Sequence, residues 1–135
     1  GNLYITLQIE EDAIFKRDGD DVHVETPITI SQAVIGGYVT VPTLTGEVQV
    51  KIPPGTQPGE RRVLRGKGIK RQHGFGNGNE YIYFVVVIPT KITEEQRKII
   101  KDFAKTEGKP PAVGSEHTKK FSFFKKFKEF FKHAN

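Results

Sequence analysis

The sequence predicts a mainly β protein, a small antiparallel β-sandwich with a short internal helix, followed by amphipathic helices at the C-terminal end. Apolar and polar residues alternate over much of the first part of the chain, a period of two that is typical of strands with one buried face. Glycine and proline clusters interrupt these runs, as expected of turns between short strands. Beyond residue 91 the apolar spacing changes to the period of an α-helix.

Three alternating runs predict half-buried strands that pair in an antiparallel manner, and they cover residues 3–9, 22–30 and 48–52. A further run at residues 81–88 is apolar throughout and rich in β-branched residues. It predicts a central strand covered on both faces.

Turn-forming residues stand where these strands should end. The Asp18-Gly19 pair predicts a hairpin turn, because glycine accepts a positive φ. Residues 31–35 predict a single helical turn with Ser31 as the N-cap. The run Pro53-Pro54-Gly55 ends the following strand, and closely spaced glycines predict a loop over residues 66–79.

A capping box predicts the first C-terminal helix, over residues 92–108. Thr93 is followed three residues later by Gln96, and Gly108 marks the helix end. The helix would present an apolar stripe of Ile99, Ile100, Phe103 and Ala104. Residues 109–118 then read as a linker.

A second amphipathic helix is predicted for the Phe/Lys-rich tail at residues 119–135, with Ser122 as its cap. Its stripe comprises Phe123, Phe124, Phe127, Phe130, Phe131 and Ala134, and its lysines project elsewhere. So short a helix is marginal alone in water, so we expect the stripe to pack on another surface.

Composition argues against an enzyme or a metalloprotein. The chain has no cysteine, and its four histidines lack the spacing of metal ligands. No nucleophile elbow or phosphate-binding glycine motif is present. We therefore expect no catalytic residue, no metal and no cofactor. The apolar runs are too short to span a bilayer, and Gly1 suggests that the sequence was cut from a longer protein.

The net charge of +5 is concentrated in the tail. Residues 1–114 carry 15 Lys/Arg and 14 Asp/Glu, whereas residues 115–135 carry 6 Lys and 2 Glu. A basic run extends from Arg61 to Arg71 without an acidic residue and could contact phosphates. It could equally protect an edge strand or face the acidic segment at residues 10–21, and we expect no nucleic-acid partner.

Ordered motifs extend along nearly the whole chain, at residues 15–25, 31–37, 41–46, 52–59, 64–69, 78–81 and 92–96. They resemble, in sequence and spacing, the C-terminal substrate-binding and dimerisation region of DnaJ-type co-chaperones. The Phe/Lys tail is similar to the C-terminal helix of bacterial-type members of this family.

The resemblance implies a domain division. Residues 1–10 would be the last strand of a preceding β domain or an N-terminal strand, and residues 11–91 would be the second C-terminal β domain. The family's J-domain carries a His-Pro-Asp tripeptide and its zinc module carries C-x-x-C-x-G-x-G repeats, and this sequence contains neither. The family's main client pocket lies on the preceding domain.

The resemblance also implies a function and partners. The chain would dimerise and hold unfolded polypeptides, which the full protein delivers to a DnaK-type ATP-dependent chaperone. Such a protein would work in the mitochondrial matrix or another organelle, or in a bacterial cytoplasm.

The predicted dimer interface is apolar and comprises Ile92, Ile99, Ile100, Phe103, Phe124, Phe127 and Phe131. Alternatively, the first four pack on the chain's own sheet. A function of another class is also open, because a Lys-rich face opposite a Phe-rich face suits binding to a membrane surface.

Overall fold

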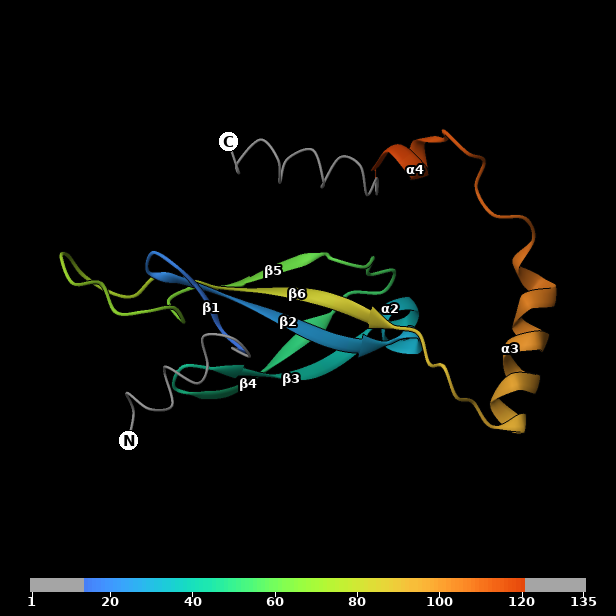
Figure 1. Ribbon diagram of the computed structural model, residues 1–135, viewed down its shortest axis with the longest axis horizontal. Helices are drawn as coiled ribbons and strands as arrows, with labels where there is room; N and C mark the ends of the chain where they lie inside the picture. Colours follow the sequence, from blue (N-terminus) through green and yellow to red (C-terminus); the bar gives the residue numbers. More distant parts are fainter. Residues whose placement is uncertain (1–13, 121–135) are drawn as a thin grey trace. The chain divides into compact units, whose positions relative to one another are not determined.

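The computed structural model describes residues 14–120 and divides into two compact units, Gly1–Ile88 and Pro89–Asn135. The described part of the first unit contains two sheets and one short helix (Figure 1). Its elements are β1 (Lys16–Asp18), β2 (Asp21–Thr29), α2 (Ile30–Ile35), β3 (Gly37–Thr43), β4 (Gly46–Ile52), β5 (Arg61–Leu64) and β6 (Glu80–Val87). The mainly β class with a short internal helix is confirmed, whereas the predicted strand at residues 3–9 lies outside the described residues.

The larger sheet has the order β1-β2-β6-β5, and β3 and β4 form a separate hairpin. The neighbours β1/β2 and β5/β6 are antiparallel, but β2 and β6 run parallel, with His23 beside Tyr81. The prediction of a purely antiparallel sandwich was therefore wrong. Period-two alternation reports a buried face and is the same for both strand directions, so it carries no information on this point.

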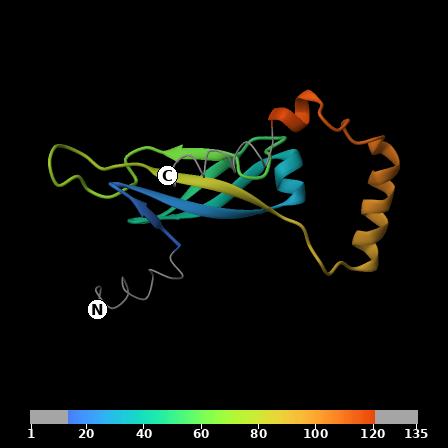
Figure 2. The ribbon, with the colours of Figure 1, turned by 45° about the horizontal axis from the view of Figure 1, so that its top comes forward.

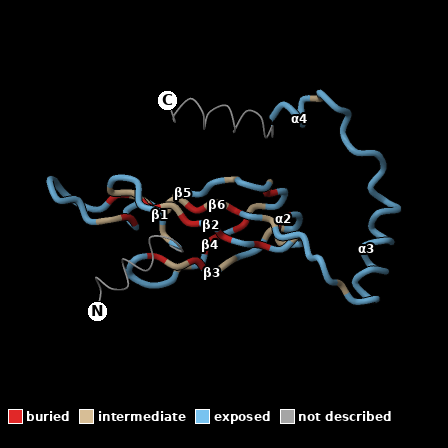
Figure 3. The backbone as a smooth tube through the Cα atoms, in the orientation of Figure 1, coloured by how far each residue is buried: buried red, intermediate tan, exposed pale blue. Residues whose placement is uncertain are grey.

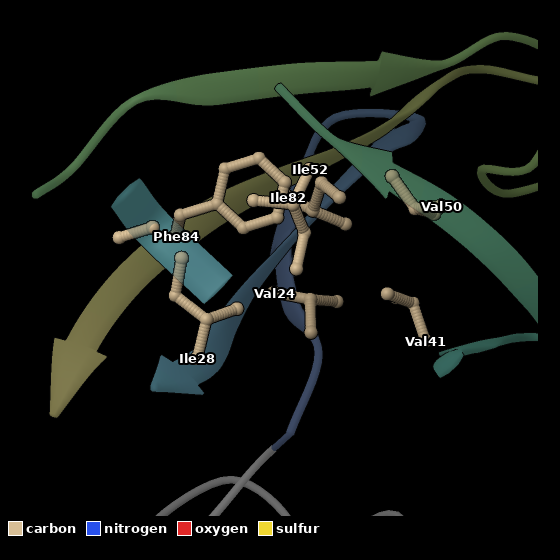
Figure 4. Close-up of a cluster of buried hydrophobic side chains, with 8 residues drawn as sticks. Val24, Ile28, Val41, Val50, Ile52, Ile82 and Phe84 are labelled. Carbon is tan, nitrogen blue, oxygen red and sulfur yellow. The ribbon is translucent and has the colours of Figure 1, made fainter. Parts of the chain in front are cut away.

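The two sheets enclose one apolar core (Figure 4). The larger sheet contributes the core-facing residues of β2 and β6, and the hairpin contributes those of β3 and β4. The buried cluster consists of Val24, Ile28, Ala33, Val41, Val50, Ile52, Ile82 and Phe84. In Figure 3 the buried segments concentrate on these facing strands.

The central strand β6 is buried on one face only. Ile82 and Phe84 are fully buried, whereas Val85 and Val87 on the other face are 37% and 50% exposed. The prediction that residues 81–88 are covered on both faces was therefore wrong, because an apolar run does not reveal whether a second layer exists. The outer face of β6 is thus a partly apolar surface.

Thr29, not Ser31, caps helix α2. The Thr29 hydroxyl accepts a hydrogen bond from the Gln32 backbone N–H, and the Gln32 side chain accepts one from the Thr29 N–H. This capping box satisfies two backbone donors at once, which a cap at Ser31 could not do at the observed helix start.

Strand β3 was not predicted from the sequence, because its Pro42 interrupts the alternating pattern.

The second unit contains α3 (Glu94–Glu107) and α4 (Glu116–Lys120). Helix α3 has the predicted capping box of Thr93 and Gln96, and Gly108 is its C-cap. Helix α4 begins at Glu116, within the segment predicted as a linker. Ser122 and the tail phenylalanines lie outside the described residues. None of the described helices is long and apolar enough to cross a membrane.

Candidate functional site

An aromatic cluster occupies the outer face of the larger sheet. The His23 ring stacks on Tyr81 and Tyr83, with ring centroids 5.3 Å and 5.6 Å apart. His23 Nδ1 is hydrogen-bonded to the Tyr83 hydroxyl at 2.6 Å, and Nε2 lies 3.4 Å from an Asp18 carboxylate oxygen. The guanidinium of Arg61 lies 4.8 Å from the centroid of Tyr81, a distance suited to a cation–π interaction. These contacts hold the rings in one orientation.

An open depression of about 690 Å³ lies beside this cluster. Ile14, Tyr83 and Val85 supply apolar surface to it, and Lys16 and Glu25 supply charges of opposite sign. Ile14 is 60% exposed and Val85 is 37% exposed, so these apolar side chains are accessible to a ligand. An apolar surface with a charged rim suits a polypeptide side chain.

The backbone edge of β2 beside this depression lacks a strand partner among the described residues. Strand β1 pairs only as far as His23, so within residues 14–120 no strand pairs with residues 24–29 on that side. Val22 N–H donates to Asn79 C=O, which directs the even-numbered residues of β2 toward β6. The N–H and C=O of Glu25 therefore point to the open edge. The backbone of Pro27 faces the same edge. A proline is tolerated there because it removes no bond from the ladder with β6.

The apolar stripe of α3 is accessible. Ile99, Ile100 and Phe103 are 57%, 52% and 53% exposed, and the helix has no buried residue. Ion pairs Glu94–Arg97 and Asp102–Lys105 lie on the remaining surface of the helix. The stripe spans roughly 100° of the helix circumference at 100° per residue, a width that suits burial against another surface.

The other predicted interface residues are distributed differently. Ile92 precedes the N-cap of α3, outside the helix, and is half-buried. Phe124, Phe127 and Phe131 lie outside the described residues. The structure therefore brings together three of the seven predicted residues on one helix face.

Sequence reasoning missed the aromatic cluster and the depression. For His23 the sequence excluded only the spacing of a metal ligand, and Tyr81 and Tyr83 fell within a strand predicted to be covered on both faces. Tyrosines two residues apart on that strand were a usable signal, because residues i and i+2 share one face of a sheet. Within residues 14–120 no group of three His, Asp or Glu side chains could hold a metal ion.

Comparison with known proteins places the chain in a family. Residues 1–89 match the model of the DnaJ C terminal domain. The chain is 48% identical over 107 residues to the mitochondrial chaperone protein dnaJ GFA2 of Arabidopsis thaliana, covering 79% of this chain and 24% of that protein. It is 41% identical over 132 residues to chaperone protein DnaJ of Bacillus licheniformis, covering 98% of this chain and 34% of that protein.

A second mitochondrial relative, chaperone protein dnaJ 1 of Arabidopsis thaliana, is 49% identical over 108 residues, covering 79% of this chain and 26% of that protein. The chain thus spans between a quarter and a third of the length of these relatives. The match to the Bacillus licheniformis protein covers nearly the whole chain. The chain therefore belongs to the DnaJ family of protein-folding chaperones, a family without enzymatic activity, and contains its C-terminal domain.

Proposed function

We propose that this chain is the homodimerisation and unfolded-client-binding module of a DnaJ-type co-chaperone. The complete protein would pass its clients to a DnaK-type chaperone through parts that this sequence does not include. Its relatives from Arabidopsis carry a mitochondrial name and others are bacterial, which supports the mitochondrial matrix or a bacterial cytoplasm as the compartment.

The observation that carries client binding is an apolar depression lying beside an open strand edge. An extended polypeptide can pair its backbone with Glu25 on β2, which gives affinity without reading the sequence. One apolar side chain of the client can then enter the depression beside Val85 and Tyr83. Unfolded chains offer both features, an unpaired backbone and exposed apolar side chains, whereas folded proteins bury them.

Replacing Val85 with aspartate should weaken binding of a permanently unfolded client at least tenfold, which corresponds to about 1.4 kcal/mol. The reason is that a client side chain would bury against a new charge. Fluorescence anisotropy with labelled, reduced and carboxymethylated lactalbumin measures the affinity.

Val87→Asp is the matched control. Val87 lies on the same face of β6 and is similarly exposed, but it does not line the depression. We expect its affinity to stay within about twofold of the original protein, well under 1 kcal/mol. Equal loss in both variants would show that the depression has no special role.

Dimerisation rests on the exposed stripe of α3. Three large apolar side chains on one helix face favour burial against the same face of a second copy, because a twofold axis makes such a patch self-complementary. Two client sites in one dimer could then contact one unfolded chain. The second contact would form at high effective concentration, so two weak interactions would add to useful avidity.

The double variant Ile99→Asp/Phe103→Asp should be a folded monomer, because burying unpaired charge at the dimer interface costs several kcal/mol. Sedimentation velocity over a range of concentrations reports the mass, and circular dichroism reports the fold. Lys98→Asp/Lys101→Asp, on the other side of the same helix, should remain dimeric. An unchanged dimer in the first variant would refute the assignment of α3 to the interface.

A further inference from the structure

Residues 68–78 form a long loop that extends beyond the end of the larger sheet (Figures 1 and 2). Lys70 and Asn77 form an isolated antiparallel bridge. Backbone hydrogen bonds from Arg71 N–H to Gly76 C=O and from Gly78 N–H to Ile69 C=O join the two arms at 3.0 Å and 2.9 Å. The predicted loop over residues 66–79 is confirmed, and this bridge and these hydrogen bonds join its two arms; we call residues 68–78 the ribbon.

The base of the ribbon is fixed to the turn between β1 and β2. Ile69 N–H donates to Asp20 C=O at 2.8 Å, and Asn79 N–H donates to the Asp21 carboxylate at 2.7 Å. Gly68 and Gly78 lie so close to the Asp20 backbone that a Cβ on either would overlap it. The side chains of the ribbon are therefore held at a defined place relative to the sheet.

The ribbon and the adjoining strand β5 carry an uncompensated positive charge. Residues 61–79 contain six basic residues and no acidic residue, and all six are exposed: Arg61, Arg62, Arg65, Lys67, Lys70 and Arg71. Among residues 14–120 none of them forms an ion pair with a carboxylate. The base of the ribbon lies against Asp20 and Asp21, as one interpretation of the sequence expects, but no ion pair joins these two aspartates to the cations, and residues 10–13 lie outside the described residues.

Two further features of this region suit a polypeptide ligand. The side chain of Phe75, at the tip of the ribbon between two glycines, is 99% exposed. Strand β5 is an edge of the sheet in the described residues, and Phe84 N–H donates to Glu60 C=O. By the alternation of the ladder, the N–H and C=O groups of Arg61 and Val63 point away from β6 and are open to a partner.

We propose that β5 and the ribbon form a second docking surface, which binds an acidic, extended polypeptide segment that also carries an apolar side chain. Carboxylates of the segment would pair with the cations, and its apolar side chain would cover Phe75. Charge complementarity selects this partner, because six exposed cations without an ion pair among the described residues attract anions and repel basic segments. The proposal extends the proposed function by assigning a charge class to part of the bound polypeptide.

Polypeptide suits this surface better than single-stranded nucleic acid. Nucleic-acid grooves combine cations with several aromatic platforms on which successive bases stack. Here the ribbon offers only the rings of His73 and Phe75, and Arg61 already lies against the ring of Tyr81. If the charges served only to protect an edge strand from aggregation, charges on β5 itself would be enough. They would not explain the further cations and the exposed phenylalanine on the ribbon.

The test uses two labelled peptides, one rich in glutamate with a single phenylalanine, and the same peptide with every glutamate replaced by glutamine. The 135-residue chain should bind the glutamate peptide at least tenfold more tightly at low salt, and the preference should shrink as salt rises. Lys70→Glu/Arg71→Glu should abolish this preference without changing the melting temperature, and Phe75→Ala should weaken binding of both peptides.

Lys98→Glu/Lys101→Glu, which makes the same charge change on α3, should keep the preference. Val85→Asp should also keep the preference for the glutamate peptide. A wrong assignment of the depression and a wrong assignment of this second surface would therefore give different results. Equal affinity for both peptides, or an unchanged preference in Lys70→Glu/Arg71→Glu, would overturn the proposal. Displacement of the glutamate peptide by an oligonucleotide at lower concentration than by unlabelled peptide would overturn it in favour of nucleic acid.

Discussion

Replacing Glu80 with glutamine should stabilise the β unit at pH 8 by about 3 kcal/mol and leave its stability nearly unchanged at pH 4. Glu80 is fully buried, and neither carboxylate oxygen has a hydrogen-bond partner. Desolvation raises its pKa from the ordinary value of 4.5 to about 7, against an opposing effect of the Lys67 ammonium. Each pKa unit corresponds to about 1.4 kcal/mol.

The direction in which the stability changes with pH follows from proton binding to Glu80. Between pH 4.5 and about 7 the folded state keeps a proton on Glu80 that the unfolded state releases. The free energy of unfolding therefore falls as the pH rises through this interval, and the contribution is constant above it. Glutamine has no proton to lose, so the difference between the two proteins should grow over the same interval.

Urea unfolding followed by circular dichroism at a series of pH values measures this difference. Glu47→Gln is the control, because Glu47 is exposed on β4. Lys67→Ala should extend the fall in stability to higher pH, because it removes the charge that lowers the pKa of Glu80. Parallel stability curves for Glu80→Gln and the original chain would show that the pKa of Glu80 is the same in the folded and unfolded states, which would contradict its desolvation in the fold.

Gly78→Ala should destabilise the β unit by about 3 kcal/mol or more, since overpacking against a fixed backbone forces a segment to move. An added Cβ would lie 2.1 Å from the Asp20 carbonyl oxygen and 2.5 Å from its carbon. Relieving this overlap requires the ribbon to separate from the β1–β2 turn, with loss of the Ile69–Asp20 hydrogen bond. Glycine is required here by close approach of two backbones.

Gly76→Ala provides the comparison. Gly76 has a φ of +79°, but a Cβ there would meet nothing within 4 Å. Its replacement should therefore cost only about 1 kcal/mol, the strain of a left-handed residue. Denaturant unfolding gives both values, and hydrogen exchange at the Ile69 amide reports the ribbon base. Equal costs at the two positions would contradict the close approach at Gly78.

Sequence patterns predicted most of the local structure. The Asp18-Gly19 turn, strand β4 and the capping box at Thr93 depend on residues close together in the chain, and each is present. The family was also evident from ordered motifs, and the comparisons confirm it. The location of α2 was predicted but its cap was not, because Thr29 and Ser31 are both good N-cap residues.

The parts that could not be predicted depend on contacts between distant segments. Nothing in the alternation of β2 or β6 reveals that they run parallel, or that the outer face of β6 is left partly open beside His23. Likewise, the fixed base of the ribbon depends on the approach of Gly68 and Gly78 to Asp20, which lies far away in the sequence.

The sequence alone determined the family, the strand and helix periodicity and the apolar stripe of α3, because all of these depend on residues that are close together in the chain. Only the tertiary structure decided which surfaces are accessible within residues 14–120: the depression beside Val85, the edge of β2 beyond its pairing with β1, and the exposed cations of β5 and the ribbon. Exposure and pairing are properties of segments that meet across the fold, and local patterns specify which face is apolar but not what lies against it.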